Sequence, residues 1–214
     1  RSETDMGCGP QLRLHLDSLT MKADFAECEV DLQFTDFVPR FDWYTLLGHP
    51  GHNSSHFETS GAVKGRVRLG SREIEINALG YRDRSWGPRH WHDIRATRWW
   101  PTVFGPDLTI FTISSVTPLG SGAFGFMIKD GVPQRLTDIR ALATLDWDAF
   151  SPVSGEGSFT MADGTRGRLL HEPADGIVLN VRGYTAMESI GTAQFGDRVG
   201  MSNYEICTNP LGGT

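Results

Sequence analysis

Hydrophobic and polar residues alternate along several stretches of this 214-residue chain. In residues 28–34, for example, every second side chain is apolar and the side chains between them are polar. The same period recurs in residues 12–16, 66–69, 73–78, 139–147 and 177–181. A period of two places alternate side chains on opposite faces of a strand, which is typical of half-buried antiparallel strands.

Short turn sequences separate these stretches. Gly70-Ser71, Asp130-Gly131 and Asp163-Gly164 each fit a tight hairpin turn, where Gly and Asp tolerate positive φ. No run of about 12 residues has a helical period. The 25 glycines and 11 prolines are spread along the chain, as in proteins with many short strands. The pattern predicts about ten to thirteen hairpin-connected strands.

An antiparallel sheet of this size must close or fold over to protect its edges. A barrel of about eight or more strands leaves an interior that can hold a ligand. We therefore predict an all-β fold, an antiparallel β-barrel with a central ligand cavity, as a single domain over residues 1–214. The irregular residues 36–56 are interpreted as a loop near the barrel mouth.

Composition and charge argue against several classes of function. The net charge is −6, and the basic residues form no stripe of the kind that binds nucleic acid. No apolar run approaches the ~18 residues of a membrane span. The three cysteines are few and odd in number, so they predict no disulfide framework, which favours a reducing, cytoplasmic compartment. Because the chain begins with Arg1, we expect a processed chain or a piece of a longer protein.

Charged, ionisable and aromatic side chains are most concentrated in residues 80–91, Gly-Tyr-Arg-Asp-Arg-Ser-Trp-Gly-Pro-Arg-His-Trp. Three arginines, one carboxylate, one histidine and three aromatic rings occur together there, and Gly87-Pro88 ends the preceding strand. Two interpretations remain open. The segment is either a structural corner held by Arg–Asp pairs and Trp–Pro packing, or a functional site.

This segment resembles the central motif of the lipocalin-like carotenoid 1,2-hydratase (hydroxyneurosporene synthase) superfamily, which includes uncharacterised bacterial relatives and fungal pericyclase-type cyclases. Residues 56–61, 98–100 and 202–205 are also similar to the uncharacterised relatives. The resemblance implies a lipocalin-like (calycin-type) barrel, the second of two consecutive barrels. It also implies an enzyme, or a ligand-binding relative, that handles an apolar isoprenoid, steroid or polyketide. The chain departs from the commoner motif at Arg84, where histidine is frequent.

Asp83 is the leading catalytic candidate. A carboxyl group that stays protonated in an apolar cavity could protonate an alkene, and aromatic rings could stabilise the resulting cation. Adjacent arginines would instead keep Asp83 ionised, as a base or an orienting group. Glu205 is the second catalytic candidate, with a surface position as the alternative. The predicted substrate-binding residues are Tyr81, Arg82, Trp86, His90, Trp91, Trp99, His56, Glu58 and Tyr204.

The catalytic hypothesis depends on strand register. The alternation of residues 72–79 would turn Arg82 inward and Asp83 outward. We therefore predict a bulge or kink at or next to Gly80, which would exchange the two faces and turn Tyr81 and Asp83 toward the interior. With a regular strand through residue 84, Asp83 in solvent and Arg82 inside, Asp83 would not be the acid. The site would then be organised around Arg82 and would seek a carboxylate-bearing substrate.

Three histidines, His49, His52 and His56, have a spacing that fits no single face of a strand or helix. These histidines could form a metal set with Glu58 or Asp42 as a further ligand, but a polar loop is favoured, with His56 and Glu58 as polar groups at the cavity mouth. We predict no metal and no cofactor.

Three functions follow from these patterns. The first is a cofactor-free hydro-lyase, isomerase or cyclase acting on an apolar molecule. The second is a non-catalytic carrier of such a ligand. The third is a structural half of a larger assembly, with a companion lipocalin-like domain or a second copy of the chain. Substitution of Asp83 by Asn should abolish turnover but preserve ligand binding only in the first case.

Overall fold

A computed structural model describes residues 3–5, 11–14, 18–46, 55–87, 93–181 and 184–209. These residues contain fifteen strands and one four-residue helix. The chain divides into two compact units, residues 1–87 and 88–214. The prediction of an all-β fold is therefore confirmed. None of the described helices is long and apolar enough to cross a membrane.

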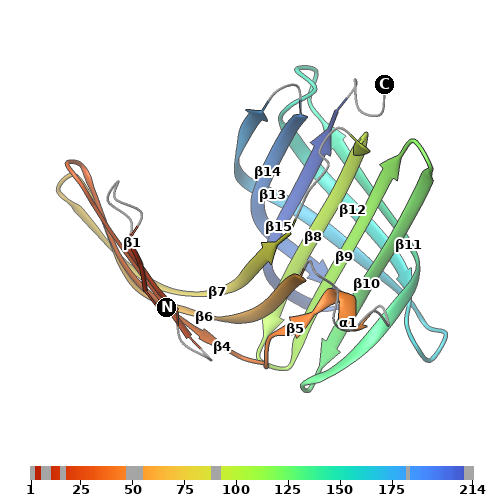
Figure 1. Cartoon of the computed structure of the whole chain (residues 1–214), viewed down its shortest axis with the longest axis horizontal. Coiled ribbons are helices and arrows are strands. Elements are labelled where there is room, and N and C mark those ends of the chain that lie inside the picture. Colours follow the sequence, from red (N-terminus) through yellow and green to blue (C-terminus); the bar gives the residue numbers. More distant parts are fainter. Residues whose placement is uncertain are drawn as a thin grey trace. The chain divides into compact units, whose positions relative to one another are not determined.

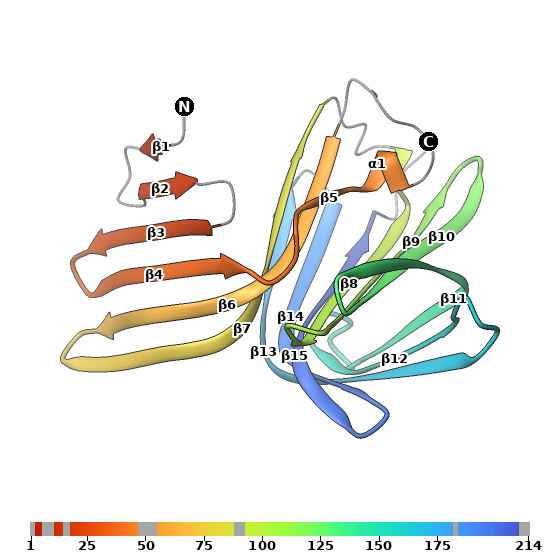
Figure 2. The ribbon, with the colours of Figure 1, turned by 90° about the horizontal axis from the view of Figure 1, so that it is seen from below.

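The first unit is a curled half-barrel sheet of seven antiparallel strands (Figure 2). Its elements are β1 (Glu3–Asp5), β2 (Gln11–Leu14), β3 (Ser18–Phe25), β4 (Cys28–Asp36), β5 (Phe41–Asp42), α1 (Trp43–Leu46), β6 (Ser55–Leu69) and β7 (Arg72–Trp86). Strand β6 pairs with β4 along its C-terminal half and with β5 near its N-terminal end. Strand β7 pairs with β6 along its whole length, so these two strands form one long hairpin.

The two faces of this hairpin differ as the alternation predicts. Even-numbered residues of β7 include Ile74 and Ile76, which are half-buried, whereas Glu73 and Glu75 are exposed on the other face. The two-residue turn at residues 70–71 joins the strands, with φ of +57° at Gly70. This turn was predicted correctly.

The β6–β7 register continues without a break from Leu69↔Arg72 to Ser55↔Trp86. The predicted bulge at Gly80 is therefore wrong. Gly80 lies opposite Gly61, and the ring of Phe34 packs over this glycine pair. A Cβ at Gly61 would lie 2.5 Å from that ring, and a Cβ at Gly80 would lie 2.5 Å from Val63 Cγ2. Close packing, not a bulge, explains glycine at residue 80.

The second unit is a closed eight-stranded antiparallel barrel, coloured from green to blue in Figure 1. Its strands are β8 (Ala96–Gly105), β9 (Leu108–Thr117), β10 (Gly120–Lys129), β11 (Val132–Leu145), β12 (Pro152–Thr160), β13 (Arg166–Val181), β14 (Tyr184–Phe195) and β15 (Arg198–Thr208). Consecutive strands pair, and β8 pairs with β15 to close the barrel. The predicted barrel is thus confirmed, and it is built from residues 96–208.

Large side chains from all eight strands pack into one hydrophobic core. Trp100 and Tyr204 are fully buried there and stack with ring centroids 4.4 Å apart. Gly155 and Gly157 on β12 make room for these rings, since a Cβ at either position would lie within 2.7 Å of a ring carbon. Side chains therefore fill the barrel at this level. The central ligand cavity stays a prediction.

Two of the predicted hairpin turns lie between strands of the barrel. Asp130 and Gly131 have φ of +51° and +77°, as a tight hairpin between β10 and β11 requires. Residues 161–165 form a wider turn than the Asp163-Gly164 pair predicts. The alternation over residues 139–147 predicts a strand that includes Trp147. Strand β11 instead ends at Leu145, and Trp147 lies in the following turn, where it is 93% exposed. Whether residues 1–214 act as a single domain stays a prediction.

Candidate functional site: the His56–Glu58–Asp83 cluster

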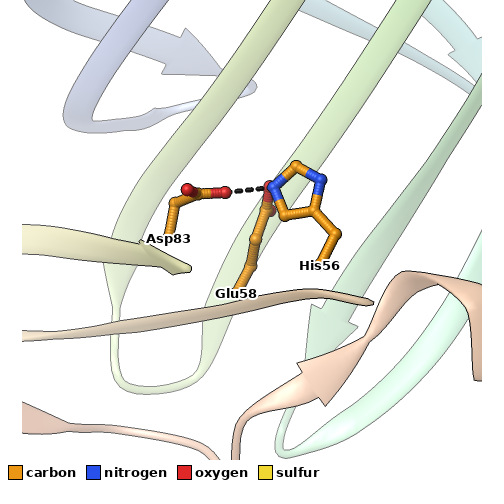
Figure 3. A group of neighbouring side chains, drawn as sticks. All are labelled: His56, Glu58 and Asp83. Carbon is orange, nitrogen blue, oxygen red and sulfur yellow. Dashed lines mark hydrogen bonds and ion pairs between the residues drawn. The ribbon is translucent and has the colours of Figure 1, made fainter. Parts of the chain in front are cut away.

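One face of the β6–β7 hairpin gathers a histidine and two carboxylates (Figure 3). His56 and Glu58 are two residues apart on β6, so their side chains share a face. Glu58 pairs directly with Asp83 on β7, which adds the second carboxylate to the same face. The unbroken register therefore builds this cluster without any bulge.

Both carboxylates converge on one nitrogen of the imidazole. His56 Nε2 is hydrogen-bonded to Asp83 Oδ2, and it lies 3.3 Å from Glu58 Oε1. Two acidic groups thus share a single partner that can carry positive charge. An imidazole in contact with two carboxylates can pass a proton among these side chains and to a bound molecule.

Burial increases across the cluster. The side chain of Asp83 is 31% exposed, that of His56 is 17% exposed, and that of Glu58 is fully buried. The outer carboxylate can therefore meet solvent or a substrate, whereas the inner one is held in place by its surroundings. This gradient gives the two carboxylates different environments, which is the arrangement that separates acid and base roles in enzymes.

An aromatic ring fixes the imidazole. Trp43 stacks on His56, with ring centroids 3.9 Å apart and an interplanar angle of 27°. Strand β5 sets this position because Phe41 pairs with Glu58 and the chain then turns into α1. Asp42 caps that turn, where its Oδ1 accepts a hydrogen bond from the backbone N–H of Thr45 at 3.3 Å. Sequence analysis missed Trp43 because it lies in the segment interpreted as an irregular loop.

Arg82 lies on the opposite face of β7 from Asp83, as the unbroken strand requires. Its guanidinium pairs with Asp36 at 2.8 Å, donates to the carbonyl of Ser18 at 2.9 Å and lies over the ring of Phe34. The side chains of Arg82 and Asp36 are 8% and 5% exposed, so the pair is nearly buried. A carboxylate of the protein already pairs with Arg82. The structure therefore offers no support for an anion site organised around this residue. The strand is regular and Arg82 is buried, as the alternative to a bulge requires. Asp83 is only partly exposed and is hydrogen-bonded to His56, so its role as an acid stays a proposal.

The other predicted residues of this segment lie on both faces. Tyr81 is half-buried on the face of Asp83, opposite Ser60. Trp86 is 48% exposed on the other face, where it stacks on Phe57 and lies 5.4 Å from the guanidinium carbon of Arg84. Four further predicted positions, His49, His52, His90 and Trp91, lie outside the described residues.

The remaining predicted residues belong to the barrel. Tyr204 is a fully buried core residue, and its burial raises the pKa of the phenol to about 12. Glu205 alternates with Tyr204 along β15, so it projects from the opposite face of the strand, where it pairs across strands with Trp99. Its Oε1 accepts a hydrogen bond from the thiol of Cys207 at 3.0 Å. Glu205 and Asp83 thus belong to different units.

The barrel also contains a buried polar network that was not predicted from the sequence. His171 Nδ1 lies 2.9 Å from Ser202 Oγ, and its Nε2 lies 2.8 Å from Ser189 Oγ. Trp100 donates its indole N–H to Ser202 at 2.8 Å. Burial lowers the pKa of His171 to about 4, so the imidazole is neutral near neutral pH. The spacing of His171 from Leu169 is the sequence signal that would have placed it inside.

The cluster on β6 and β7 also has the donor set of a metal site. One oxygen from each carboxylate and one imidazole nitrogen all lie within 4.8 Å of one another. Imidazole and carboxylate ligands suit first-row divalent metals. The three atoms can therefore serve either as an acid–base group or as ligands.

Comparisons with known proteins give a family but no activity. No curated protein matches this sequence. The model of one family, described as a domain of unknown function, matches residues 3–210 and so covers both units. The chain therefore belongs to the family of the domain of unknown function DUF7064.

Proposed function

We propose that this protein is a cofactor-free acid–base enzyme, a hydro-lyase, isomerase or cyclase, that acts on an apolar isoprenoid-, steroid- or polyketide-like molecule. The observation that carries the proposal is the imidazole of His56 held between partly exposed Asp83 and buried Glu58. Imidazole and carboxylate side chains in contact can pass a proton among themselves and to a bound molecule. Proton transfer to carbon is the step that hydration or isomerisation of an alkene or enol needs.

The chemistry follows from the exposure of each group. The proton shared by Asp83 and His56 is transferred to one carbon of a double bond, which leaves a cation on its neighbour. Water then bonds to the cationic carbon and gives up a proton to the cluster, which yields the hydrated product. Loss of a proton from an adjacent carbon instead yields the isomer. The ring of Trp43, stacked on His56, provides a π-face that favours positive charge nearby.

Two observations support an apolar substrate. Aromatic side chains, Trp43 and Tyr81, lie on or beside the cluster. The neighbouring arginines, Arg82 and Arg84, project from the opposite face, where Arg82 pairs with Asp36 and Arg84 lies over Trp86. The resemblance of residues 80–91 to lipocalin-like hydratases and cyclases points to the same class of molecule.

A second candidate function is a non-catalytic carrier of an apolar ligand. The closed eight-stranded barrel favours it, because barrels of this size hold one small ligand in several binding proteins. The aromatic packing of Trp100 against Tyr204 fills part of that interior. The acid–base cluster therefore remains the stronger basis for a function.

Solvent labelling tests the proposal without a known substrate. Purified protein is incubated in heavy water with a panel of isoprenoids, steroids and polyketides, and mass spectrometry follows deuterium incorporation. We expect the wild-type protein to label or convert one compound class, and Asp83→Asn and His56→Gln to abolish this while ligand binding persists. Asp31→Asn is the matched control, since Asp31 is a partly exposed carboxylate of β4 paired with Lys22. If one of the compounds binds equally well to wild type and Asp83→Asn, and neither wild type nor any variant incorporates deuterium into it, the result would favour a non-catalytic carrier.

A further inference from the structure

The same cluster has a second chemical property, which follows from its charge. Asp83 is hydrogen-bonded to His56 Nε2, and Glu58 Oε1 lies 3.3 Å from the same nitrogen. A protonated imidazole offsets one of the two carboxylate charges. A divalent cation held by a neutral imidazole and both carboxylates would offset both charges and satisfy all three groups.

The distances suit such an ion. Zinc lies about 2.0–2.2 Å from imidazole nitrogen and carboxylate oxygen, so neighbouring ligand atoms in a tetrahedral site are about 3.3 Å apart. The separation of His56 Nε2 and Glu58 Oε1 is 3.3 Å. Asp83 Oδ2 lies closer than this to Nε2, but its partly exposed side chain can rotate away. The ion would replace the hydrogen bond between His56 and Asp83.

Two further features favour a defined site over a loose acidic patch. Glu58 is fully buried on a paired strand, and stacking on Trp43 fixes the plane of His56. These two ligands are therefore preorganised. Partial exposure of His56 and Asp83 leaves an approach from solvent and a fourth position for water, as in zinc sites with three protein ligands.

We infer that His56, Glu58 and Asp83 form a binding site for a divalent transition metal such as Zn²⁺, which excludes the proton from the same three atoms and so inhibits the proposed acid–base activity. The inhibitory part rests on the proposed function. The binding part does not, because it depends only on the three ligands.

Metal titration of the untagged, chelator-treated protein tests the inference. Calorimetry with Zn²⁺ is expected to show one site per chain, and Co²⁺ is expected to give the visible absorption bands of a metal bound by nitrogen and oxygen ligands. His56→Gln and Asp83→Asn should each weaken binding by about tenfold or more. His171→Gln and Asp31→Asn are the controls, since they remove a histidine and a carboxylate outside the cluster, and they should leave binding unchanged.

Several outcomes separate this inference from the proposed function. Absence of one-to-one binding at millimolar Zn²⁺, or equal affinity in wild type and Asp83→Asn, would overturn the metal site. Circular dichroism of Asp83→Asn checks that the variant is folded, and His56→Gln repeats the test if it is not. Deuterium incorporation that persists in chelator and stops on addition of Zn²⁺ supports both proposals. Incorporation that requires the metal contradicts a cofactor-free enzyme and the inhibitory role together, while leaving the binding site intact.

Discussion

The buried histidine of the barrel makes stability depend on pH in a specific way. His171 is 3% exposed and both of its ring nitrogens lie within hydrogen-bond distance of serine hydroxyls. Burial penalises the charged imidazolium and lowers the pKa of His171 from 6.5 to about 4. The unfolded chain exposes this side chain to water, so it binds a proton near the ordinary pKa. Acidification therefore favours the unfolded state.

The size of the effect follows from the two pKa values. The pKa of His171 is near 6.5 in the unfolded chain and about 4 in the folded protein. This difference lowers the unfolding free energy by about 3 kcal/mol once the pH is below 4. The contribution of His171 is fully present above pH 6.5 and is lost progressively as the pH falls toward 4. Between about pH 7 and about pH 5 the expected loss is about 2 kcal/mol.

Urea unfolding at several pH values measures this loss. Wild type and His171→Gln are unfolded at about pH 7, 6 and 5, with tryptophan fluorescence and circular dichroism as probes. The remaining ionisable groups are common to both proteins, so the difference between their pH dependences isolates His171. We expect the unfolding free energy of wild type to fall by about 2 kcal/mol more than that of the variant.

Nuclear magnetic resonance of the histidine rings gives an independent measurement. The ring signals of His171 should stay those of the neutral form down to about pH 5. Equal pH dependence of stability in the two proteins would refute the reasoning. So would a His171 ring that becomes charged near pH 6.5.

Two predictions concern packing and buried charge. Gly157→Ala should destabilise the barrel by about 1–3 kcal/mol, because the added Cβ would lie 2.7 Å from Trp100 Cζ3. Gly122→Ala is the control, since its Cβ would meet open space and should change the unfolding free energy little. Thermal unfolding of both variants compares the two effects. Arg82→Met should destabilise the first unit by about 3–5 kcal/mol, because the buried carboxylate of Asp36 loses its ion pair with the guanidinium of Arg82. The double variant that also carries Asp36→Leu should recover much of that loss, because it removes the buried carboxylate as well. Equal stability of Arg82→Met and wild type in urea would show that the ion pair is not needed.

Local alternation predicts strands well, because a half-buried strand needs apolar residues on one face only. It predicts the positions of β4, β7 and most of β11, only the C-terminal end of β6, and the tight turns at residues 70–71 and 130–131. It does not say which strands close a barrel. The half-barrel sheet and the closed barrel have the same period of two, and the difference between them lies in pairings such as β8 with β15, which are distant in sequence. Gly87-Pro88 predicts the end of a strand, but the local pattern does not identify it as the division between two units.

The candidate site shows how a turn can fix long-range geometry. A two-residue turn pairs residues that lie at equal distances from it, and the turn at residues 70–71 does so along the whole β6–β7 hairpin. Extending that register from the turn places Glu58 opposite Asp83, with His56 beside them on the same face.

The bulge predicted at Gly80 would have broken this register and separated the residues that form the cluster. It rested on the assumption that Asp83 must share a face with Ile76 and Ala78. The structure instead keeps Ile76 and Ala78 on one face and the acid–base cluster on the other. Gly61 and Gly80 leave space for the ring of Phe34 within this unbroken register. The regular hairpin therefore brings together the residues on which the proposed chemistry depends.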